Sequence, residues 1–341
     1  MKRIGLIDLD YNGRFPNIAL MKISAYHKSV GNLVEWYNGF MEEPYDIVFI
    51  AKVFSWTPDY PYYINAYEII KGGSGYFIKC DNSHETYEKP ENGAVFPAVT
   101  ENVAICDCLP KEIEHMYPDY SIYPAQLTKD TAYGFLTRGC PRGCSFCHVS
   151  TKEGKRSRKV ANLSEFWRGQ KNIVLCDPNI LACRSWRDLL HQLIKSKAYV
   201  DFNQGLDARM MTPEKAHMLG KIRIREIHFA WDRYEDKERV LKGLRIYQRY
   251  AEKKPSMHSL IVYVLVNFDT THEQDLERIY TLRDMGYWAY VMIYDKENCD
   301  QWYIDLQRWC NNRYVFARVP NFDDYMKDVE DGSIWTKNLF D

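Results

Sequence analysis

The chain has 341 residues, of which 46% are hydrophobic, and its formal net charge is −1 at pH 7. This length suits two domains or one large domain, and the apolar fraction is ample for a sizeable core. The small net charge excludes a global field that would draw the protein onto nucleic acid or a membrane. The sequence contains no run of 18 apolar residues and begins with no signal peptide, so we expect a cytoplasmic protein without a membrane partner.

Residues 1–80 predict a small Rossmann-like α/β domain. Short apolar runs predict buried parallel strands, and amphipathic stretches between them predict helices. The predicted strands cover residues 3–8, 33–36 and 46–53, and the predicted helices cover residues 16–30 and 63–70. This alternation of strands and helices implies an open α/β sheet.

Residues 81–130 predict a connector, because prolines interrupt them and they show little periodicity. One short helix is expected near residues 111–116. Cys106 and Cys108 lie in this segment, but their C-x-C spacing is awkward for a single metal ion. We therefore expect core or surface thiols here.

From residue 131 the pattern becomes regular, with six strands that are each followed by a helix. The predicted strands cover residues 133–137, 172–176, 199–204, 225–231, 259–268 and 287–294. The predicted helices cover residues 164–168, 185–197, 212–220, 236–250, 271–286 and 301–310. Six such units predict a parallel sheet that curls into a partial (β/α)6 TIM-like barrel over residues 131–310. Residues 311–341 form a C-terminal tail.

Three cysteines, Cys140, Cys144 and Cys147, follow the first strand of this predicted barrel at C-x3-C-x2-C spacing. Three thiolates on one short loop suit a soft metal centre. A structural zinc site normally has four protein ligands, whereas a 4Fe–4S cluster held by three cysteines leaves one iron to bind a small molecule. The alternatives are a zinc knuckle with His148 as the fourth ligand, or three unrelated core thiols. Phe146 would shield a cluster from water.

The C-x3-C-x2-C spacing, with Phe146 before the third cysteine, resembles the signature of the radical SAM superfamily. The resemblance extends over roughly residues 130–300. It implies that Cys140, Cys144 and Cys147 hold a 4Fe–4S cluster whose open iron binds S-adenosyl-L-methionine. An electron donor such as flavodoxin or ferredoxin would reduce the cluster. Cleavage of the cofactor would then give a 5′-deoxyadenosyl radical that abstracts a hydrogen atom from the substrate.

In a strand–helix barrel, chemistry lies at the carboxyl ends of the strands. That rule selects Asp177, Asn179, Gln204, Asp207, Arg209, Asp232 and Asn267. Arg209 suits the cofactor carboxylate because a guanidinium binds carboxylates in fork geometry. Gln204 or Asp207 would bind ribose hydroxyls or substrate. The resemblance supports Gln204 and Arg209, and it assigns adenine to the backbone of Val266 and Asn267. The alternative is that these polar groups cap helices, a role that we expect for Thr271 and that Asp232 would also suit.

The predicted domain in front of the cysteines resembles the cobalamin-binding-like domain of many radical SAM proteins. Residues 8–13 contain no histidine, however, so the usual lower axial ligand is missing and cobalamin is not expected. We expect a degenerate domain used for substrate docking or assembly. The missing histidine also disfavours a cobalamin-dependent methyltransferase.

A methylthiotransferase would need a second three-cysteine cluster upstream of the first. Cys80, Cys106 and Cys108 imitate such a cluster poorly. Cys299 and Cys310 lack the dense spacing of an auxiliary iron–sulfur domain, so no auxiliary cluster is expected. A contrasting interpretation from another class is a non-catalytic, metal-stabilised binding protein.

Five of the eight residues from Lys152 to Lys159 are basic. This segment predicts contact with phosphate, an anionic substrate or, locally, nucleic acid. The alternative is a solvated surface loop. A modified nucleotide or RNA base is therefore one candidate substrate, and a peptide is the next.

Overall fold

The computed structural model describes residues 1–81, 84–88, 103–251 and 259–331. The chain is a mixed α/β protein with parallel sheets, which confirms the predicted fold class at this level. Its contacts divide it into two compact units, Met1–Asn203 and Gln204–Asp341. Among the described helices, none has both the length and the apolar character that crossing a membrane requires.

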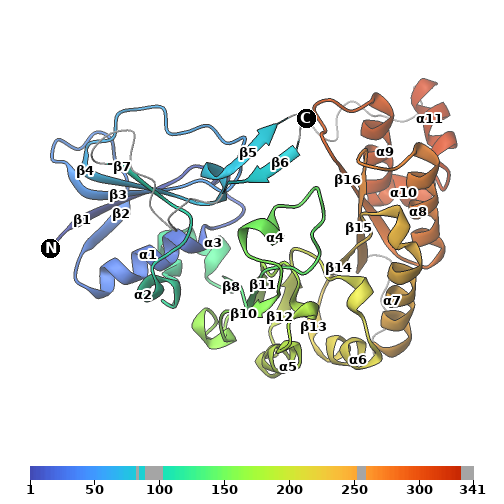
Figure 1. The fold of residues 1–341 in the computed structure, drawn as a ribbon, viewed down its shortest axis with the longest axis horizontal. Coiled ribbons are helices and arrows are strands. Elements are labelled where there is room, and N and C mark those ends of the chain that lie inside the picture. The colour runs from blue at the N-terminus through green and yellow to red at the C-terminus, as the bar shows by residue number, and fades with distance from the viewer. Residues whose placement is uncertain (82–83, 89–102, 252–258, 332–341) are drawn as a thin grey trace. The chain divides into compact units, whose positions relative to one another are not determined.

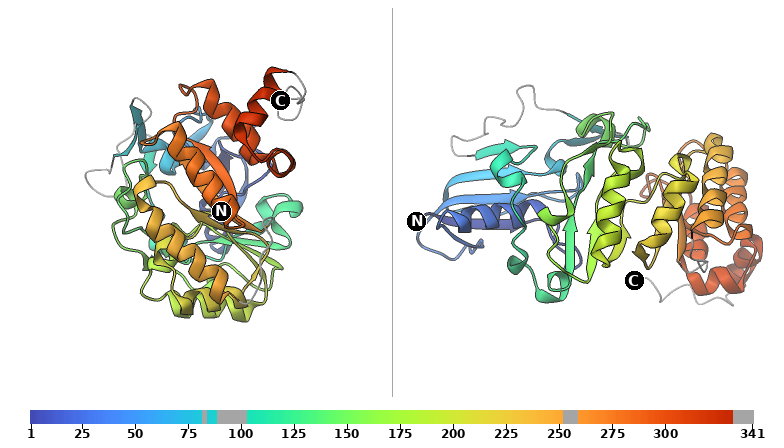
Figure 2. Two further views of the ribbon diagram at one scale, coloured as in Figure 1. Left: turned by 90° about the vertical axis from the view of Figure 1, so that its right-hand side faces the viewer. Right: turned by 90° about the horizontal axis from the view of Figure 1, so that it is seen from below.

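A five-stranded parallel sheet begins the first unit, and its strand order is β2-β1-β3-β4-β7. The strands are β1 (Arg3–Asp8), β2 (Leu33–Trp36), β3 (Tyr45–Ala51), β4 (Ala66–Gly72) and β7 (Val103–Cys106). Helix α1 (Ile18–Ser29) runs along one face of the sheet (Figures 1 and 2). Its Leu20 and Ile23 pack against Ile4 and Phe49 of the strands, so this face is a closed apolar core.

The prediction of a helix over residues 63–70 is wrong, because Ala66–Gly72 is strand β4. This segment pairs with β3 on one side and with β7 on the other, and the resulting ladders override its local pattern. Strand β7 lies within the predicted connector and was also missed. The short helix expected near residues 111–116 is confirmed as α2 (Lys111–Glu114).

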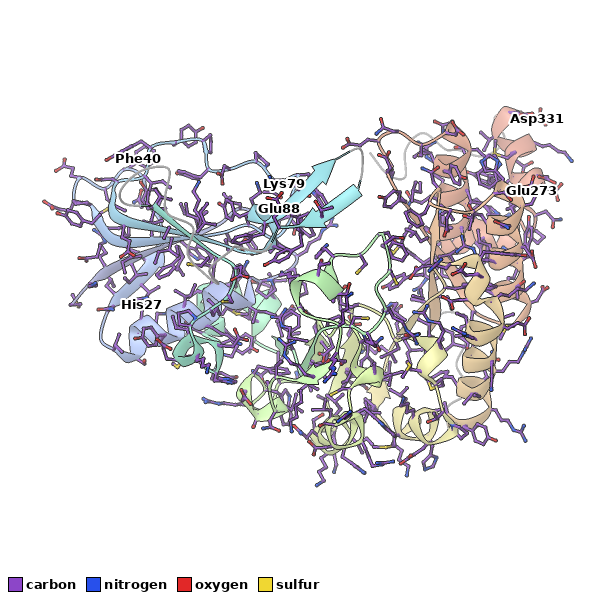
Figure 3. All side chains as sticks on the ribbon, in the orientation of Figure 1. His27, Phe40, Lys79, Glu88, Glu273 and Asp331 are labelled. Carbon is purple, nitrogen blue, oxygen red and sulfur yellow. The ribbon has the colours of Figure 1, made fainter. Side chains whose placement is uncertain are left out.

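Between β4 and β7 the chain forms an antiparallel hairpin of β5 (Ile78–Asp81) and β6 (His84–Tyr87). Lys79 pairs with Glu88 at 2.8 Å, and both side chains lie on this hairpin in Figure 3. Three short elements complete this part of the unit. They are the 3-10 turns η1 (Ser74–Tyr76) and η2 (Tyr120–Ile122) and helix α3 (Ala125–Thr128).

The first unit also contains three parallel strands in the order β8-β11-β12. They are β8 (Thr131–Gly134), β11 (Asn172–Leu175) and β12 (Tyr199–Phe202), and helix α5 (Trp186–Ser196) follows β11. A short antiparallel ribbon of β9 (Thr137–Arg138) and β10 (Arg158–Lys159) follows β8. The remaining elements are α4 (Val149–Lys152), η3 (Leu163–Glu165) and η4 (Ile180–Ala182).

The helix predicted over residues 164–168 is only the 3-10 turn η3. A capping box formed by Asn162 and Glu165 starts this turn. Gly169 soon follows with a φ of 100°, a left-handed conformation that a helix does not continue through.

The second unit is built on the parallel sheet β14-β15-β16. Its strands are β14 (Ile227–Ala230), β15 (Leu260–Val266) and β16 (Trp288–Ile293), besides a short β13 (Arg223–Ile224). The longer helices are α6 (Pro213–Lys221), α7 (Lys237–Tyr250), α8 (His272–Asp284), α9 (Gln301–Asn311), α10 (Arg313–Arg318) and α11 (Phe322–Glu330). The 3-10 turns are η5 (Ala208–Met210) and η6 (Tyr234–Asp236). Helices α8 and α9 pack along the sheet, as Figure 1 shows.

All six strands predicted after residue 131 are present, three in each unit. Thr212 caps α6 and Thr271 caps α8 with their side-chain oxygens, as their sequence positions predict. The predicted tail contains α10 and α11, which follow α9 directly.

Candidate functional site

The three cysteines lie on the loop that leads from β9 to α4. Cys140, Cys144 and Cys147 are all half-buried, and none of them is in a disulfide bond. The Cys147 N–H donates to the carbonyl of Cys144 at 3.1 Å, which gives the second half of the loop a tight turn. Phe146 is half-buried between the last two cysteines. The carbonyl of His148 accepts from the Lys152 N–H at 2.9 Å, so His148 begins α4.

A buried carboxylate fixes the backbone just before this loop. The carboxylate of Asp177 accepts from the N–H of Leu136 at 3.1 Å and from both the N–H and the hydroxyl of Thr137 at 2.5 Å. Asp177 and Thr137 are both buried. Burial raises the pKa of Asp177 to about 6, although these hydrogen bonds oppose the shift. Asp177, which the strand-end rule selects, therefore orients the loop.

Glu153 holds the same loop from the other side. Its carboxylate accepts from the Gly139 N–H at 2.9 Å and pairs with the Arg138 guanidinium at 2.6 Å. The guanidinium of Arg138 also lies 3.4 Å from the centre of the Phe135 ring. Gly139 has a φ of 85°, and a Cβ there would lie 2.3 Å from the carbonyl oxygen of Arg156. Only glycine fits at position 139, so this residue is what allows the chain before Cys140 to pack against the backbone of Arg156.

Asn179 links the loop to the end of β11. Its side-chain amide donates to the sulfur of Cys140 at 3.6 Å, and its backbone carbonyl accepts from the Ser157 hydroxyl at 2.8 Å. Asn179 is buried, with 3% of its surface exposed. Asn179 therefore ties the side chain of Cys140 to the chain that follows β11.

The donor set of the loop fits the predicted cluster in its chemistry, because three thiols are soft ligands. Within the part of the chain that the structure describes, no three Cys, His, Asp or Glu side chains are grouped closely enough to hold a metal ion. Cys106 is half-buried and Cys108 is exposed. Partial desolvation and the neighbouring Asp107 carboxylate raise the pKa of Cys108 to about 11, so this thiol stays protonated at neutral pH. The side chain of Cys80 lies outside the described residues.

In the second unit, Arg209 is held by two carboxylates. Its Nε donates to Asp207 at 2.7 Å and its Nη1 donates to Asp236 at 2.6 Å. Asp207 also caps the turn η5, because its side chain accepts from the Arg209 N–H. These ion pairs join η5 to the start of α7. Gln204, at the beginning of this segment, is exposed.

Asp232 follows β14 and is half-buried. Burial raises its pKa to about 6, and the nearby guanidinium groups of Arg209 and Arg278 oppose that shift. The carboxyl end of β14 is therefore followed by Asp232, a carboxyl group with a raised pKa. Arg209, the cation predicted to bind the cofactor, lies near enough to influence that pKa.

Val266 and Asn267 end β15. Val266 is fully buried, so it presents only its backbone, and its carbonyl accepts from the Tyr294 N–H at 3.0 Å. Asn267 has a φ of 60°, and its side-chain amide donates to the carbonyl of Tyr294 at 2.8 Å. This left-handed residue turns the chain sharply and ties the end of β15 to the end of β16.

Arg278 on α8 is a residue that the sequence prediction missed. It is fully buried, and its Nη1 donates to the carbonyls of Trp231 at 2.8 Å and Asp232 at 2.9 Å. Its Nη2 donates to the carbonyl of Leu265 at 2.6 Å and pairs with Asp275 at 2.5 Å. One guanidinium thus fixes the carboxyl ends of β14 and β15. The spacing of Asp275 and Arg278 suggests an ordinary exposed i,i+3 pair, so it gives no signal of this role.

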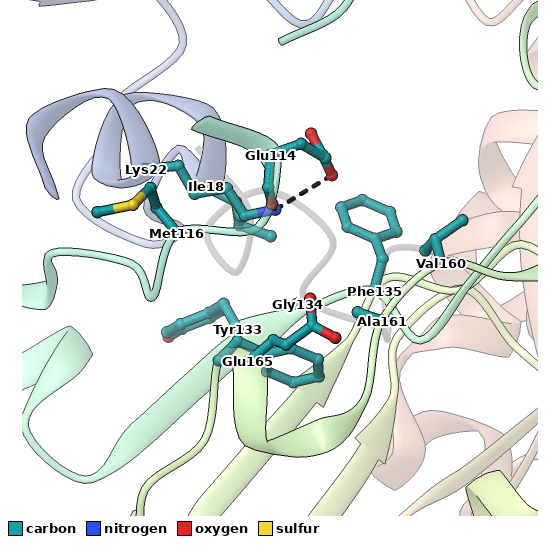
Figure 4. A pocket seen from close by; sticks show the side chains of 11 residues that line it. Ile18, Lys22, Glu114, Met116, Tyr133, Gly134, Phe135, Val160, Ala161 and Glu165 are labelled. Carbon is teal, nitrogen blue, oxygen red and sulfur yellow. Dashed lines mark hydrogen bonds and ion pairs between the residues drawn. The ribbon is translucent and has the colours of Figure 1, made fainter. Parts of the chain in front are cut away.

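A small pocket lies between α1, α2 and β8 (Figure 4). Lys22 and Glu114 form an ion pair of 3.1 Å at its edge, and Tyr133, Phe135 and Phe166 contribute aromatic walls. Its volume is ≈ 10 Å³, which is room for about one water molecule. It is too small to hold a cofactor or a substrate.

No protein-family model matches the chain, and no curated protein matches its sequence. The case for a function therefore rests on the residues and their geometry.

Proposed function

We propose that this chain is a radical SAM enzyme. The observation that carries the proposal is the loop of Cys140, Cys144 and Cys147, three half-buried soft ligands on the loop that follows β8 and the short strand β9. The loop is held by fixed contacts to Asp177, Glu153 and Asn179, so its backbone is ordered without a fourth protein ligand. This arrangement suits a 4Fe–4S cluster with one iron open to a small molecule.

In this proposal Cys140, Cys144 and Cys147 hold the cluster, and Phe146 limits the access of water to it. When bound, the cluster supplies the electron that cleaves S-adenosyl-L-methionine to methionine and a 5′-deoxyadenosyl radical. The protein groups chiefly hold and orient the cofactor, because the cofactor performs the difficult step.

The cofactor-binding residues are proposed at the carboxyl ends of later strands. A guanidinium carries five N–H groups, so Arg209 can pair with Asp207 and Asp236 and also bind the cofactor carboxylate. Gln204 and Asp207 are assigned to ribose hydroxyls or substrate. Asp232 is assigned to the cofactor, and the backbone of Val266 and Asn267 is assigned to its adenine. The proposal also assumes that the six strands after residue 131 form a partial (β/α)6 TIM-like barrel.

The wider setting of the proposal is a cytoplasmic enzyme reduced by a flavodoxin or a ferredoxin. The Rossmann-like sheet before the cysteines would serve substrate docking or assembly. Its Asp8 accepts from the Tyr123 hydroxyl at 2.5 Å, and its Asp10 accepts from the Val53 N–H and the Thr57 hydroxyl at 2.5 Å. Both carboxylates therefore bind the protein's own loops, which supports a role without cobalamin.

Anaerobic reconstitution with iron and sulfide tests the proposal. We expect brown protein with about four irons per chain that cleaves S-adenosyl-L-methionine to 5′-deoxyadenosine under dithionite. Replacing Cys140, Cys144 and Cys147 by Ala should abolish both properties. A matched variant with Cys108→Ala and Cys299→Ala should retain them. One bound zinc with no cleavage would contradict the proposal and would favour a non-catalytic, metal-stabilised binding protein.

A further inference from the structure

Positive charge is concentrated around the cysteine loop. Residues 138–159 carry seven basic residues and one acidic residue, Glu153, and their formal charge is therefore +6. The whole chain has a net charge of −1, so the remaining residues carry −7. The seven basic residues are Arg138, Arg142, Lys152, Lys155, Arg156, Arg158 and Lys159. This asymmetry produces a local field that the composition of the whole chain conceals.

The structure separates these cations by what they contact. Arg138 pairs with Glu153 at 2.6 Å, and Lys159 pairs with Asp188 at 2.9 Å. Arg158 donates to the carbonyl of Glu153 at 2.5 Å. Lys152 is half-buried. Its pKa is lowered mainly by burial and to a smaller extent by repulsion from Arg138. These cations therefore contribute to the folding of the loop itself.

Lys155 and Arg156, in the bend between α4 and β10, are exposed like Arg158 and Lys159 but differ from them in their contacts. Among the residues that the structure describes, neither has an ion-pair partner. Two adjacent cations thus project from a backbone whose position is already fixed. Such preorganisation lowers the entropic cost of binding an anion.

The turn that carries Lys155 and Arg156 is in direct contact with the cysteine loop. The Cys140 N–H donates to the carbonyl of Gly154 at 3.1 Å. The carbonyl oxygen of Arg156 lies 2.3 Å from the place that a Cβ on Gly139 would take. An anion held by the two exposed cations would therefore lie near Cys140, at the start of the cysteine loop.

We propose that Lys155 and Arg156 bind a compact phosphate group, such as the diphosphate of a small-molecule substrate, at the mouth of the cysteine loop. Arginine binds phosphate through two parallel hydrogen bonds, and lysine adds a point charge. A compact anion contacts mainly the two exposed cations, whereas an extended nucleic acid also meets the rest of the chain, whose formal charge outside residues 138–159 is −7. The observations therefore favour a small phosphate ester over RNA. Only the assignment of this ligand as substrate rests on the proposed function.

The test is the binding of inorganic pyrophosphate to the full chain, measured by isothermal titration calorimetry. The protein is kept metal-free, so that pyrophosphate does not act by chelating iron. We expect binding that weakens with added salt. The double variant Lys155→Ala/Arg156→Ala should bind about tenfold more weakly, since it loses two charge-assisted contacts.

A charge-matched control is Lys171→Ala/Lys195→Ala, which removes two exposed cations elsewhere in the same unit. This control should bind pyrophosphate as the unmodified chain does. Equal binding by both double variants, or no binding by the unmodified chain, would overturn the proposal. Tighter binding of single-stranded RNA than of pyrophosphate, with a steeper salt dependence, would also overturn it. Because no cluster takes part, failure of reconstitution leaves this result unaffected.

Discussion

Two fully buried charged side chains organise the two candidate regions, and they have opposite signs. In the first unit the carboxylate of Asp177 accepts from backbone N–H groups at Leu136 and Thr137. In the second unit the guanidinium of Arg278 donates to backbone carbonyls at Trp231, Asp232 and Leu265. Each charge satisfies the backbone groups that are left unpaired where strands end.

Asp177 and Arg278 have opposite charges because different backbone groups are unpaired at the two sets of strand ends. The chain after β8 leaves the sheet with N–H groups that need an acceptor, and Asp177 supplies it from the end of β11. The chain after β14 and β15 leaves carbonyls that need a donor, and Arg278 supplies several N–H groups from α8. Among the residues that the structure describes, no basic side chain is hydrogen-bonded to the carboxylate of Asp177, whereas Arg278 is paired with Asp275 at 2.5 Å. The two regions should therefore respond differently to mutation and to pH.

The largest expected effect is that of Arg278→Ala. The variant leaves the buried carboxylate of Asp275 without its cation and three carbonyls without their donor, so the free energy of unfolding should fall by about 3–5 kcal/mol. Urea denaturation measures the loss, and hydrogen exchange should place it in residues 204–341. Arg239→Ala is the control, because that side chain is 76% exposed and should change stability by less than about 0.5 kcal/mol. A loss no larger than that of the control would contradict the role assigned to Arg278.

The next effect is a pH dependence due to Asp177. Its pKa is about 6 in the folded protein and near its ordinary value of 3.8 when unfolded, so the folded state binds this proton more tightly. The stabilisation is complete below about pH 4 and is lost as the pH rises through 6. The shift corresponds to at most about 3 kcal/mol.

Asp177→Asn cannot titrate, so it isolates this effect. The difference in unfolding free energy between the unmodified chain and Asp177→Asn should decrease as the pH rises from 4 to 7. Asp232, whose pKa is also about 6, is present in both proteins and cancels in the comparison. Urea denaturation at several pH values measures the difference, and a difference that stays constant would refute the assignment.

A smaller effect is expected for Glu153→Ala. The variant removes the acceptor for the Gly139 N–H and the partner of Arg138, so stability should fall by about 1–2 kcal/mol. The reconstituted protein should also retain less iron, because the loop before Cys140 loses its anchor. Glu114→Ala removes a more exposed ion pair with Lys22 and serves as the control for both measurements. Unchanged iron content in Glu153→Ala would show that the cysteine loop binds iron without the contacts of Glu153.

The smallest expected effect is that of Arg209→Ala on cofactor binding. If the proposed function holds, affinity for S-adenosyl-L-methionine should fall about tenfold while the iron content stays unchanged. Arg209→Lys keeps the charge but loses the fork, so its affinity should be intermediate. Equilibrium dialysis with the reconstituted protein measures both variants. Equal affinity in all three proteins would assign Arg209 to structure alone, through its pairs with Asp207 and Asp236.

Most of the strands and helices could be predicted because their signals are local. Apolar runs gave β1, β3 and β15, and the capping residues Thr212 and Thr271 gave the starts of α6 and α8. Ala66–Gly72 was mistaken for a helix because its strand identity depends on neighbours on both sides. Strand β7 was missed for the same reason.

The cysteine loop was also readable from the sequence, since its ligands lie within eight residues and their spacing is itself the signal. Asn179 could be found through its place after β11. Arg278 could not, because the carbonyls to which it donates lie 13 to 47 residues away and its helix gives no local sign of burial.

The three-thiol set, the alternation of strands and helices and the concentration of positive charge around Cys140 can all be recognised in the amino-acid sequence. These features are encoded by neighbouring residues, so no long-range contact is needed to recognise them. Which of the charged side chains pair within the protein and which face solvent depends on the three-dimensional fold. Arg138 and Arg278 are held by internal partners, while Lys155 and Arg156 are exposed. The physical reason is that burial and pairing depend on residues brought together from distant parts of the chain.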